Sequence, residues 1–260
     1  MAATPDFSYI GKIENGLLAN RPSLESVYEG AWVWRFANGF TRRANSLQSL
    51  DRDDDAGFEK RLDIHWQRSR QRGIEPVFRV TPLTPPKVIE FLLGEGFERQ
   101  GNTRVMVRDA NIADKAAQQT ELQDLAIVAH RVSDPLWQKQ ILVLENIGEK
   151  DADTFIQMLE KLPQSAVGLS LVQRDGGVIG VAYASCHNGI GSVFALEVVP
   201  GQRGKGFGRL LMNYMHGWLK DNGARQLALQ VVVENSVALR LYQSFGYEEK
   251  YRYYYLVGKK

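Results

Sequence analysis

Residues 198–211 read VVPGQRGKGFGRLL, and this stretch decides the fold. A short β-like run ends at a Pro-Gly pair, glycines follow at alternate positions (Gly204, Gly206, Gly208), and an amphipathic helix begins at once. Glycine lets the backbone turn tightly and approach a ligand closely. Free amides and the positive end of the dipole at a helix N-terminus favour an anion. The stretch therefore predicts a binding loop for a pyrophosphate.

The spacing of these glycines distinguishes between coenzyme classes. A dinucleotide fingerprint requires G-x-G-x-x-G, but Arg209 stands where its last glycine would fall. A Walker A loop requires G-x-x-x-x-G-K-S/T, which this stretch lacks. A glycine-rich turn without a ligand is the alternative, and the order of strand, turn, cations and helix argues against it.

The pattern Arg203-x-x-Gly206-x-Gly208, after a strand ending Val-x-Pro, resembles the coenzyme A signature of the GNAT acyltransferase superfamily. The resemblance implies acetyl-CoA as the donor and requires no metal. It implies that the backbone from Leu196 to Val198 pairs with the pantetheine amides, as a peptide adds to a sheet edge, and that this strand splays from the strand at 227–233. The residues expected at the pyrophosphate form the segment named here the glycine loop: Arg203, Gly204, Lys205, Gly206, Phe207, Gly208 and Arg209.

A second pattern places Asn235 and Tyr242 seven residues apart, on one face of a helix. With Ala238 and the pair at 246–247 it resembles the second GNAT motif. In that family the asparagine contacts the pantetheine region, and the tyrosine protonates the leaving thiolate. A phenol of pKa about 10 can donate to a thiolate whose thiol has a pKa of about 8.5. The alternative is a core tyrosine on the apolar stripe, and the glycine loop upstream favours the catalytic interpretation.

The general base is less sharply defined. Glu197 lies on the strand that enters the glycine loop, where a carboxylate can take the proton of an ammonium substrate directly or through water. Some family members carry a glutamate five residues before the asparagine, and here that position is Gln230. This departure favours Glu197 and leaves a water relay or Glu234 open. A solvated strand carboxylate is the alternative for Glu197.

Composition sets the expected environment. The chain has 260 residues, 44% of them hydrophobic, and a net charge of +2, which gives no support for a nucleic-acid or membrane partner. It lacks an apolar run of about 18 residues and a secretory leader, so we expect a cytoplasmic protein. Cys186 has no second cysteine to pair with and no base beside it, so neither a disulfide, a structural metal site nor an acyl-cysteine is expected.

The second half predicts the order β-α-α-β-β-β-α-β-α-β, which matches the GNAT fold over roughly residues 120–260. The expected elements are strands at 121–132, 166–173, 178–186, 191–199, 227–233 and 247–258, and helices at 135–146, 152–162, 206–221 and from 235 or 236. The fold class is α/β, with a mixed sheet.

A shift of 150 residues superposes the first half on the second. Gly73 falls on Gly223, the segment 96–98 falls on 246–248, and the strand at 77–80 falls on 227–230. A helix at 57–72 and strands at 33–37 and 40–50 also coincide with later elements. Internal repeats of this kind mark a duplicated unit. We therefore expect a degenerate GNAT-like domain at 1–110, a linker at 111–120 and a catalytic GNAT domain at 121–260.

The repeat also reveals a functional contrast. Residues 51–56 read DRDDDA where the second half has glycines and cations, and Leu92 falls on Tyr242. Clustered carboxylates would repel a pyrophosphate, so one coenzyme site per chain is expected.

A hairpin is expected at 32–45, with its turn at Asn38-Gly39. It carries alternating aromatic side chains together with Arg35, Arg42 and Arg43. Two interpretations are open. The hairpin forms a wall of the active half that binds an anion or orients the acceptor, or it is an aromatic core face whose arginines are solvated.

These features predict an N-acetyltransferase that moves an acetyl group from acetyl-CoA to a primary amine by direct attack in a ternary complex. The alternatives are a non-catalytic acyl-CoA-binding module and a protein-lysine acetyltransferase. We expect a monomer, as a pseudo-dimer of its halves, or a homodimer. Acceptor pockets are built from variable loops, so the acceptor itself stays open.

Overall fold

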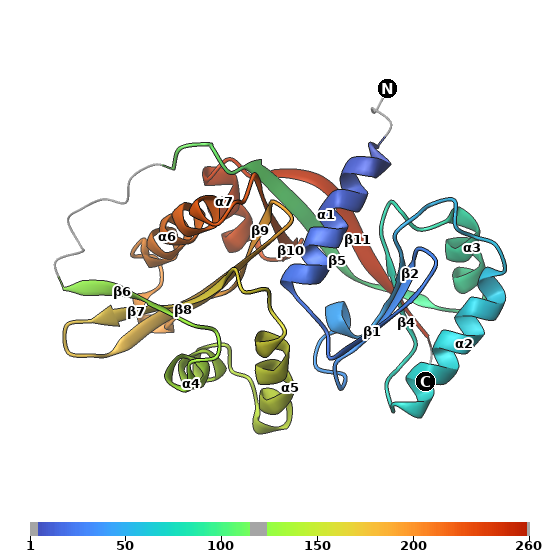
Figure 1. The fold of residues 1–260 in the computed structure, drawn as a ribbon, viewed down its shortest axis with the longest axis horizontal. Helices are drawn as coiled ribbons and strands as arrows, with labels where there is room; N and C mark the ends of the chain where they lie inside the picture. The colour runs from blue at the N-terminus through green and yellow to red at the C-terminus, as the bar shows by residue number, and fades with distance from the viewer. Residues whose placement is uncertain (1–4, 115–123, 259–260) are drawn as a thin grey trace.

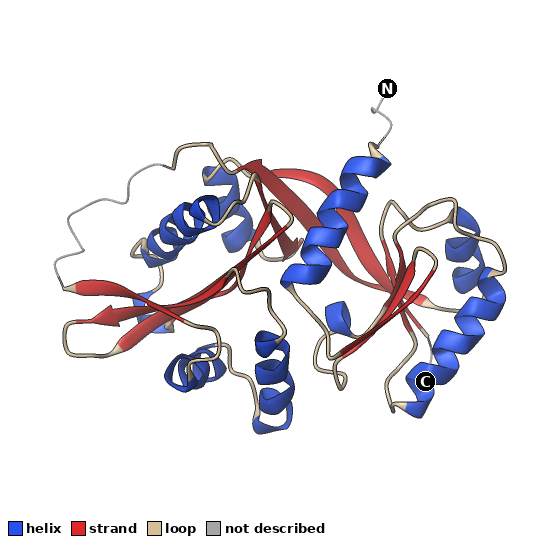
Figure 2. Ribbon diagram, in the orientation of Figure 1, coloured by secondary structure: helices blue, strands red, loops and turns tan. Residues whose placement is uncertain are grey.

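The computed structural model describes residues 5–114 and 124–258, and Figures 1 and 2 draw its fold. The first half contains α1 (Phe7–Asn20), β1 (Glu25–Glu29), β2 (Trp32–Phe36), the 3₁₀ turn η1 (Arg42–Ala44), β3 (Leu47–Ser49), α2 (Phe58–Gln71), β4 (Val77–Val80), α3 (Pro86–Gly94) and β5 (Glu98–Asp109). The second half contains β6 (Leu125–His130), α4 (Pro135–Leu144), α5 (Glu149–Glu160), β7 (Ala166–Gln173), β8 (Val178–His187), β9 (Ile190–Val198), the 3₁₀ turn η3 (Pro200–Gln202), α6 (Phe207–Asp221), β10 (Gln226–Val232), α7 (Ser236–Ser244) and β11 (Glu248–Val257).

The element order predicted for the second half is confirmed, with ends that shift by a few residues. Residues 121–123 of its first strand and 115–120 of the expected linker lie outside the described residues. Alternate residues of β8 face two separate cores. Ala182 and Ala184 pack toward α6, whereas Val181 and Tyr183 pack toward α4. The second half therefore has helices on both faces of its sheet.

The described strands of both halves join in one sheet of eleven, in the order β1-β2-β3-β4-β11-β5-β10-β9-β8-β7-β6. The last strand of each half lies beside the other half. Along β5, Met106 pairs with Leu229 of β10, and along β11, Leu256 pairs with Phe78 of β4. Figure 1 shows these two long strands crossing the centre of the molecule. The halves are thus joined by exchanged strands, and the boundaries drawn from the repeat stay a prediction.

Helix α1 belongs to the first half in sequence and packs on the second half in space (Figure 1). Asn20 Nδ2 donates to the carbonyl of Ile190 at 2.8 Å, and Ser185 Oγ donates to Asn20 Oδ1 at 2.9 Å. Gly16 lies so close to Ile190 that an added Cβ would stand 2.5 Å from the Ile190 Cβ. A side chain at Gly16 would therefore force α1 away from β9.

A buried ionic network ties α1 to both halves of the sheet. Glu14 pairs with Arg79 on β4, and it accepts a hydrogen bond from Tyr251 on β11 at 2.5 Å. Burial raises the pKa of Glu14, but the Arg79 charge and the hydrogen bonds outweigh it and hold the pKa below its usual value. Removing one partner would strand a buried charge, at a cost of about 3–5 kcal/mol.

The prediction of a hairpin at 32–45 is wrong for its second strand. Asn38 and Gly39 do turn the chain, with φ of 49° and 78°, but residues 42–44 form a 3₁₀ turn and β3 spans only Leu47–Ser49. Asn45 explains the difference, because its Oδ1 accepts from the amides of Ala37 at 2.7 Å and Gly39 at 3.0 Å. The side chain thereby satisfies backbone groups that a ladder would otherwise pair.

Candidate active site

Strands β9 and β10 separate beside the glycine loop. They pair in parallel only from Ile190 to Ser192, opposite Gln226 to Ala228. Beyond that point β9 pairs with β8 on one side and leaves its other edge without a strand partner among the described residues. The segment that contains Leu196 and Val198 therefore has an edge without a strand partner, which faces the predicted gap between the strands.

A β-bulge lies at the start of the separated segment. Phe194 pairs with Tyr183 and Glu197 with Val181, so two residues of β9 oppose one residue of β8. Ala195, within the bulge, has a φ of 51°, which a non-glycine residue rarely adopts. Bulges redirect side chains and often stand next to active sites.

The glycine loop is open to solvent and leads directly into α6. Gly204 and Gly206 have φ of 79° and 84°, and an added Cβ on either would meet nothing within 4 Å. Gly206 caps α6, and an added Cβ on Gly208 would stand 3.7 Å from Leu241 of α7. The first amides of α6 have no helical acceptor, so the loop offers donors and room to an anion.

The cations of the loop differ in their surroundings. Arg203 donates to the carbonyl of Val198 at 2.9 Å and to the carboxylate of Glu197 at 3.1 Å. Lys205 is exposed and donates to Gln202 at 2.9 Å. Arg209 lies between α6 and α7, with its guanidinium 4.6 Å from the ring centre of Phe245. Arg203 and Lys205 are therefore the cations free to turn toward a phosphate.

Helix α7 holds the second motif. Asn235 caps it, because its Oδ1 accepts from the amide of Ala238 at 3.0 Å. This gives Asn235 a structural role beside the coenzyme contact that the resemblance implies. Tyr242 is half-buried, with its ring centre 6.0 Å from that of Tyr247.

The electrostatic surroundings of Tyr242 keep its hydroxyl protonated. Burial raises the pKa of Tyr242, Arg43 opposes the rise, and Glu197 and Glu145 add to it. A phenol with a raised pKa is neutral at physiological pH and can donate a proton. Glu197 lies at the end of β9 and Glu145 follows α4; both act on this hydroxyl through their charge.

Groups from the first half complete this neighbourhood. Arg43 donates to Tyr253 Oη at 3.0 Å, and Tyr253 Oη donates to Gln230 Oε1 at 2.8 Å. Arg21 donates to Tyr183 Oη at 3.1 Å. Sequence reasoning included Arg43 in a wall beside the active half, and it missed Arg21, Tyr183 and Glu145. Their separation along the chain leaves no local pattern that joins them.

The first-half counterpart of the glycine loop, residues 51–56, is closed by its own contacts. Asp54 Oδ2 accepts from the amide of Ala31 at 2.9 Å, and Asp54 Oδ1 lies 2.7 Å from Arg61 Nη1. The Asp54 carbonyl accepts from Trp32 Nε1 at 2.8 Å. A carboxylate thus occupies the place where the second half has an open, cationic loop.

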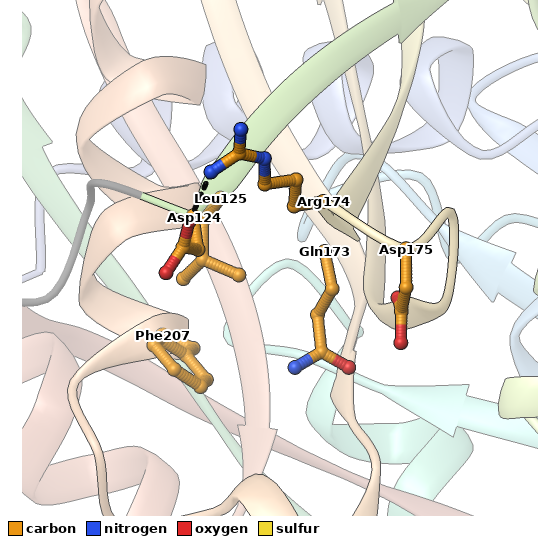
Figure 3. A pocket seen from close by; sticks show the side chains of 6 residues that line it. All are labelled: Asp124, Leu125, Gln173, Arg174, Asp175 and Phe207. Carbon is orange, nitrogen blue, oxygen red and sulfur yellow. Dashed lines mark ion pairs between the residues drawn. The ribbon is translucent and has the colours of Figure 1, made fainter.

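A shallow hollow of about 570 Å³ lies beside the first residue of α6 (Figure 3). The side chains of Leu125, Gln173 and Phe207 border it, and Asp124 and Arg174 form an exposed ion pair at 3.6 Å on its rim. Phe207 is buried at the edge of the glycine loop, so its side chain packs against the protein there.

Other sites are limited. Cys186 is buried, and burial raises the pKa of its thiol, which makes it a poor nucleophile. Over residues 5–114 and 124–258, no group of three or more His, Cys, Asp and Glu side chains is arranged to hold a metal ion. No helix in the same ranges is long and apolar enough to cross a membrane.

Comparison with known proteins identifies the family. Residues 134–247 match the model of the Acetyltransferase (GNAT) family, a span that holds both the glycine loop and α7. This segment of the chain is that of a GNAT acetyltransferase. This confirms the resemblance drawn from the sequence and supports an acetyltransferase activity of the GNAT type.

Other known proteins are similar to this chain over nearly its whole length. The Uncharacterized N-acetyltransferase YobR of Bacillus subtilis (strain 168) is 21% identical over 257 residues, which cover 96% of this chain and 99% of that protein. A GCN5-related N-acetyltransferase structure from Kribbella flavida superposes with a TM-score of 0.71 at 15% identity, covering 99% of this chain and 97% of its own. A tandem GNAT protein from the clavulanic acid biosynthesis pathway has a TM-score of 0.64 at 12% identity and covers 100% of this chain and 90% of its own. The predicted fold class, two GNAT-like halves, is confirmed.

Proposed function

We propose that this protein transfers the acetyl group of acetyl-CoA to a primary amine by direct attack in a ternary complex. The observation that carries the proposal is the separation of β9 from β10 beside an open glycine loop, with Tyr242 at the same place. A thioester coenzyme needs an anion site at one end, an extended slot for its amide-bearing arm, and an acid at its sulfur. These three parts occur here in that order.

The coenzyme binds along β9. The pyrophosphate meets the loop amides with Arg203 and Lys205, while Gly204, Gly206, Phe207, Gly208 and Arg209 shape the loop. The pantetheine arm pairs with the free edge of β9 at Leu196 and Val198, and the Asn235 side chain contacts it from α7. Because Arg203 now bonds the Val198 carbonyl, it releases that carbonyl as the arm enters.

The reaction forms one bond and breaks one. The amine nitrogen bonds to the acetyl carbon, and the bond from that carbon to sulfur breaks, with its electron pair leaving on sulfur. Tyr242 gives its phenolic proton to the thiolate. The acceptor ammonium loses one proton to Glu197, directly or through water, before the attack. The second proton, which the nitrogen releases as the amide forms, returns to the Tyr242 phenolate. No metal takes part in this scheme.

We further propose one coenzyme site per chain, in a catalytic domain at 121–260. The domain at 1–110, joined by the linker at 111–120, closes the acceptor side of the site. A cytoplasmic location and a monomer or homodimer complete the proposal.

A thiol-release assay tests the function. Purified protein is incubated with acetyl-CoA and a panel of primary amines, and free coenzyme thiol is followed with a chromogenic disulfide. Amine-dependent release is the expected result. Stoichiometric acetyl-CoA binding without release for any amine would favour the non-catalytic module. Release with lysine-containing peptides alone would favour protein-lysine acetylation.

A further inference from the structure

A buried arginine of the first half holds two other arginines in place. Arg35 is 4% exposed, and its guanidinium donates to the backbone carbonyl of Arg43 at 2.7 Å and to the carbonyl of Arg21. Its Nε lies 3.3 Å from Ser23 Oγ as a further donor contact. The Arg35 guanidinium thus donates its hydrogen bonds mainly to backbone carbonyls, and it fixes the two segments that carry Arg21 and Arg43.

The two arginines that Arg35 fixes have no carboxylate partner among the described residues. Arg21 donates to Tyr183 Oη and lies 5.6 Å from the ring centre of Phe194, and its buried Nε has no hydrogen-bond partner. Arg43 donates to Tyr253 Oη. Both arginines are partly buried and form no ion pair among the described residues, so two such guanidiniums at one place indicate a site for an anion.

This place is the acceptor side of the active site. Arg21 and Arg43 both oppose the rise that burial causes in the pKa of Tyr183, and Arg43 does the same at Tyr242. The carboxylates of Glu145 and Glu197 act on Tyr242 in the opposite sense. Arg21 lies 5.6 Å from the ring centre of Phe194, next to the bulge in β9, and Arg43 reaches Gln230 of β10 through Tyr253. The two guanidiniums therefore lie at the gap between β9 and β10.

We propose that the acceptor is an amine that also carries a carboxylate, which binds Arg21 and Arg43 while the amine lies on the Glu197 side of Tyr242. The inference rests on the proposed acetyl transfer and names its substrate class. A guanidinium binds a carboxylate through paired hydrogen bonds, so the two arginines select for the anion and orient the amine.

Charge balance favours a monoanion. Glu145 and Glu197 offset the charges of Arg21 and Arg43, so an amine with one carboxylate, which is a zwitterion, leaves the cluster neutral, whereas a phosphate dianion would add net negative charge. The cavity that Arg21 and Arg43 line with Gln230 measures about 10 Å³, which is room for one water. This cavity is too small for the acceptor, so in this proposal the acceptor reaches the two guanidiniums from the Tyr242 side.

The first test compares matched amines. Acetylation of β-alanine and L-phenylalanine is measured beside that of their carboxamides, which keep the amine and lose the charge. The acids should show the higher kcat/KM in the unaltered protein. In Arg43→Gln and Arg21→Gln the preference should fall by roughly tenfold to a hundredfold, since each variant loses a charge-assisted hydrogen bond. Arg42→Gln is the control, because Arg42 is exposed and bonds Gln100 at 2.7 Å.

The second test does not depend on turnover. Binding of N-acetyl-β-alanine and its carboxamide is measured by tryptophan fluorescence in the presence of coenzyme A, in the unaltered protein and in each variant. The unaltered protein should bind the acid more tightly than the carboxamide, and this difference should disappear in Arg43→Gln. That result supports the carboxylate site even if no amine is acetylated and the proposed function fails. Equal use of acids and amides by an active enzyme, or equal binding by unaltered and Arg43→Gln protein, would overturn the inference.

Discussion

Arg203 Nη2 donates a hydrogen bond to Glu197 Oε2 across 3.1 Å. The residue expected at the pyrophosphate therefore holds the carboxylate expected to serve as base. Arg203 also bonds the Val198 carbonyl at 2.9 Å, so coenzyme binding competes with both contacts. Movement of Arg203 to a phosphate would release the carboxylate and the pantetheine-binding edge together.

Replacing Arg203 should weaken coenzyme binding. We expect Arg203→Ala to raise the Kd for acetyl-CoA by roughly tenfold to a hundredfold, because a charge-assisted contact to phosphate is lost. Calorimetric titration measures it. Lys220→Ala, at the other end of α6, is the control and should leave the Kd unchanged. An unaltered Kd in Arg203→Ala would remove Arg203 from the pyrophosphate site.

Tyr242→Phe should separate binding from turnover. Loss of the phenolic proton should lower kcat by roughly a hundredfold or more while the Kd for acetyl-CoA stays the same. Because the pKa of Tyr242 is raised, the unaltered enzyme should keep its acid protonated and show no loss from this group up to about pH 10. Tyr214→Phe, on α6, is the control. Equal rates in Tyr242→Phe and the unaltered enzyme would refute the assigned acid.

The chain should bind one coenzyme A molecule. Gly206→Asp introduces a carboxylate and a side chain where φ is 84°, and it should abolish measurable binding. Gly57→Asp is a matched control, since Gly57 caps α2 at a φ of 64° with open space around it. Residual stoichiometric binding in Gly206→Asp would place a site in the first half.

Stability should fall in mild acid through His216. Its Nδ1 lies 2.8 Å from Asp114 Oδ2 and its Nε2 lies 2.9 Å from Tyr247 Oη. Burial lowers the pKa of His216 to about 4, despite the opposing effect of Asp114. In the unfolded chain this histidine takes up a proton near pH 6.5, whereas in the folded chain it stays neutral until about pH 4. Its contribution to the stability of the folded state is therefore present above pH 6.5 and is lost as the pH falls toward 4.

Urea unfolding measures this effect. Between about pH 7.5 and 5.5, protonation of His216 in the unfolded chain should lower the free energy of unfolding by roughly 1 kcal/mol. His216→Gln should reduce that pH dependence, and His187→Gln should retain it. The same slope in His216→Gln and the unaltered protein would assign the pH dependence to other groups.

Local pattern was enough for most elements and for the glycine loop, because turns, caps and periodicity are written in neighbouring residues. Helix α1 was missed although Ile10, Ile13 and Leu17 mark its buried face behind an N-cap at Asp6. Two glycines within that pattern weaken it as a helix signal.

The exchange of β5 and β11 could not be predicted from the sequence. Tyr251, Tyr253 and Tyr255 alternate toward a core, and such alternation predicts a strand without naming its neighbours. The proposed anion site depends on this same long-range arrangement, since Arg21 meets Tyr183 and Arg43 meets Tyr253 only once the halves are joined.

The exchanged strands also set the order in which the chain can become stable during synthesis. Strand β4 has β11 as its neighbour, so the sheet of the first half stays incomplete until residues 248–257 have left the ribosome. The buried Arg79 meets the ring of Tyr253, and its partner Glu14 meets the Tyr251 hydroxyl, at that same late stage. Release of the first half alone by proteolysis or truncation would therefore expose an unpaired edge and favour aggregation.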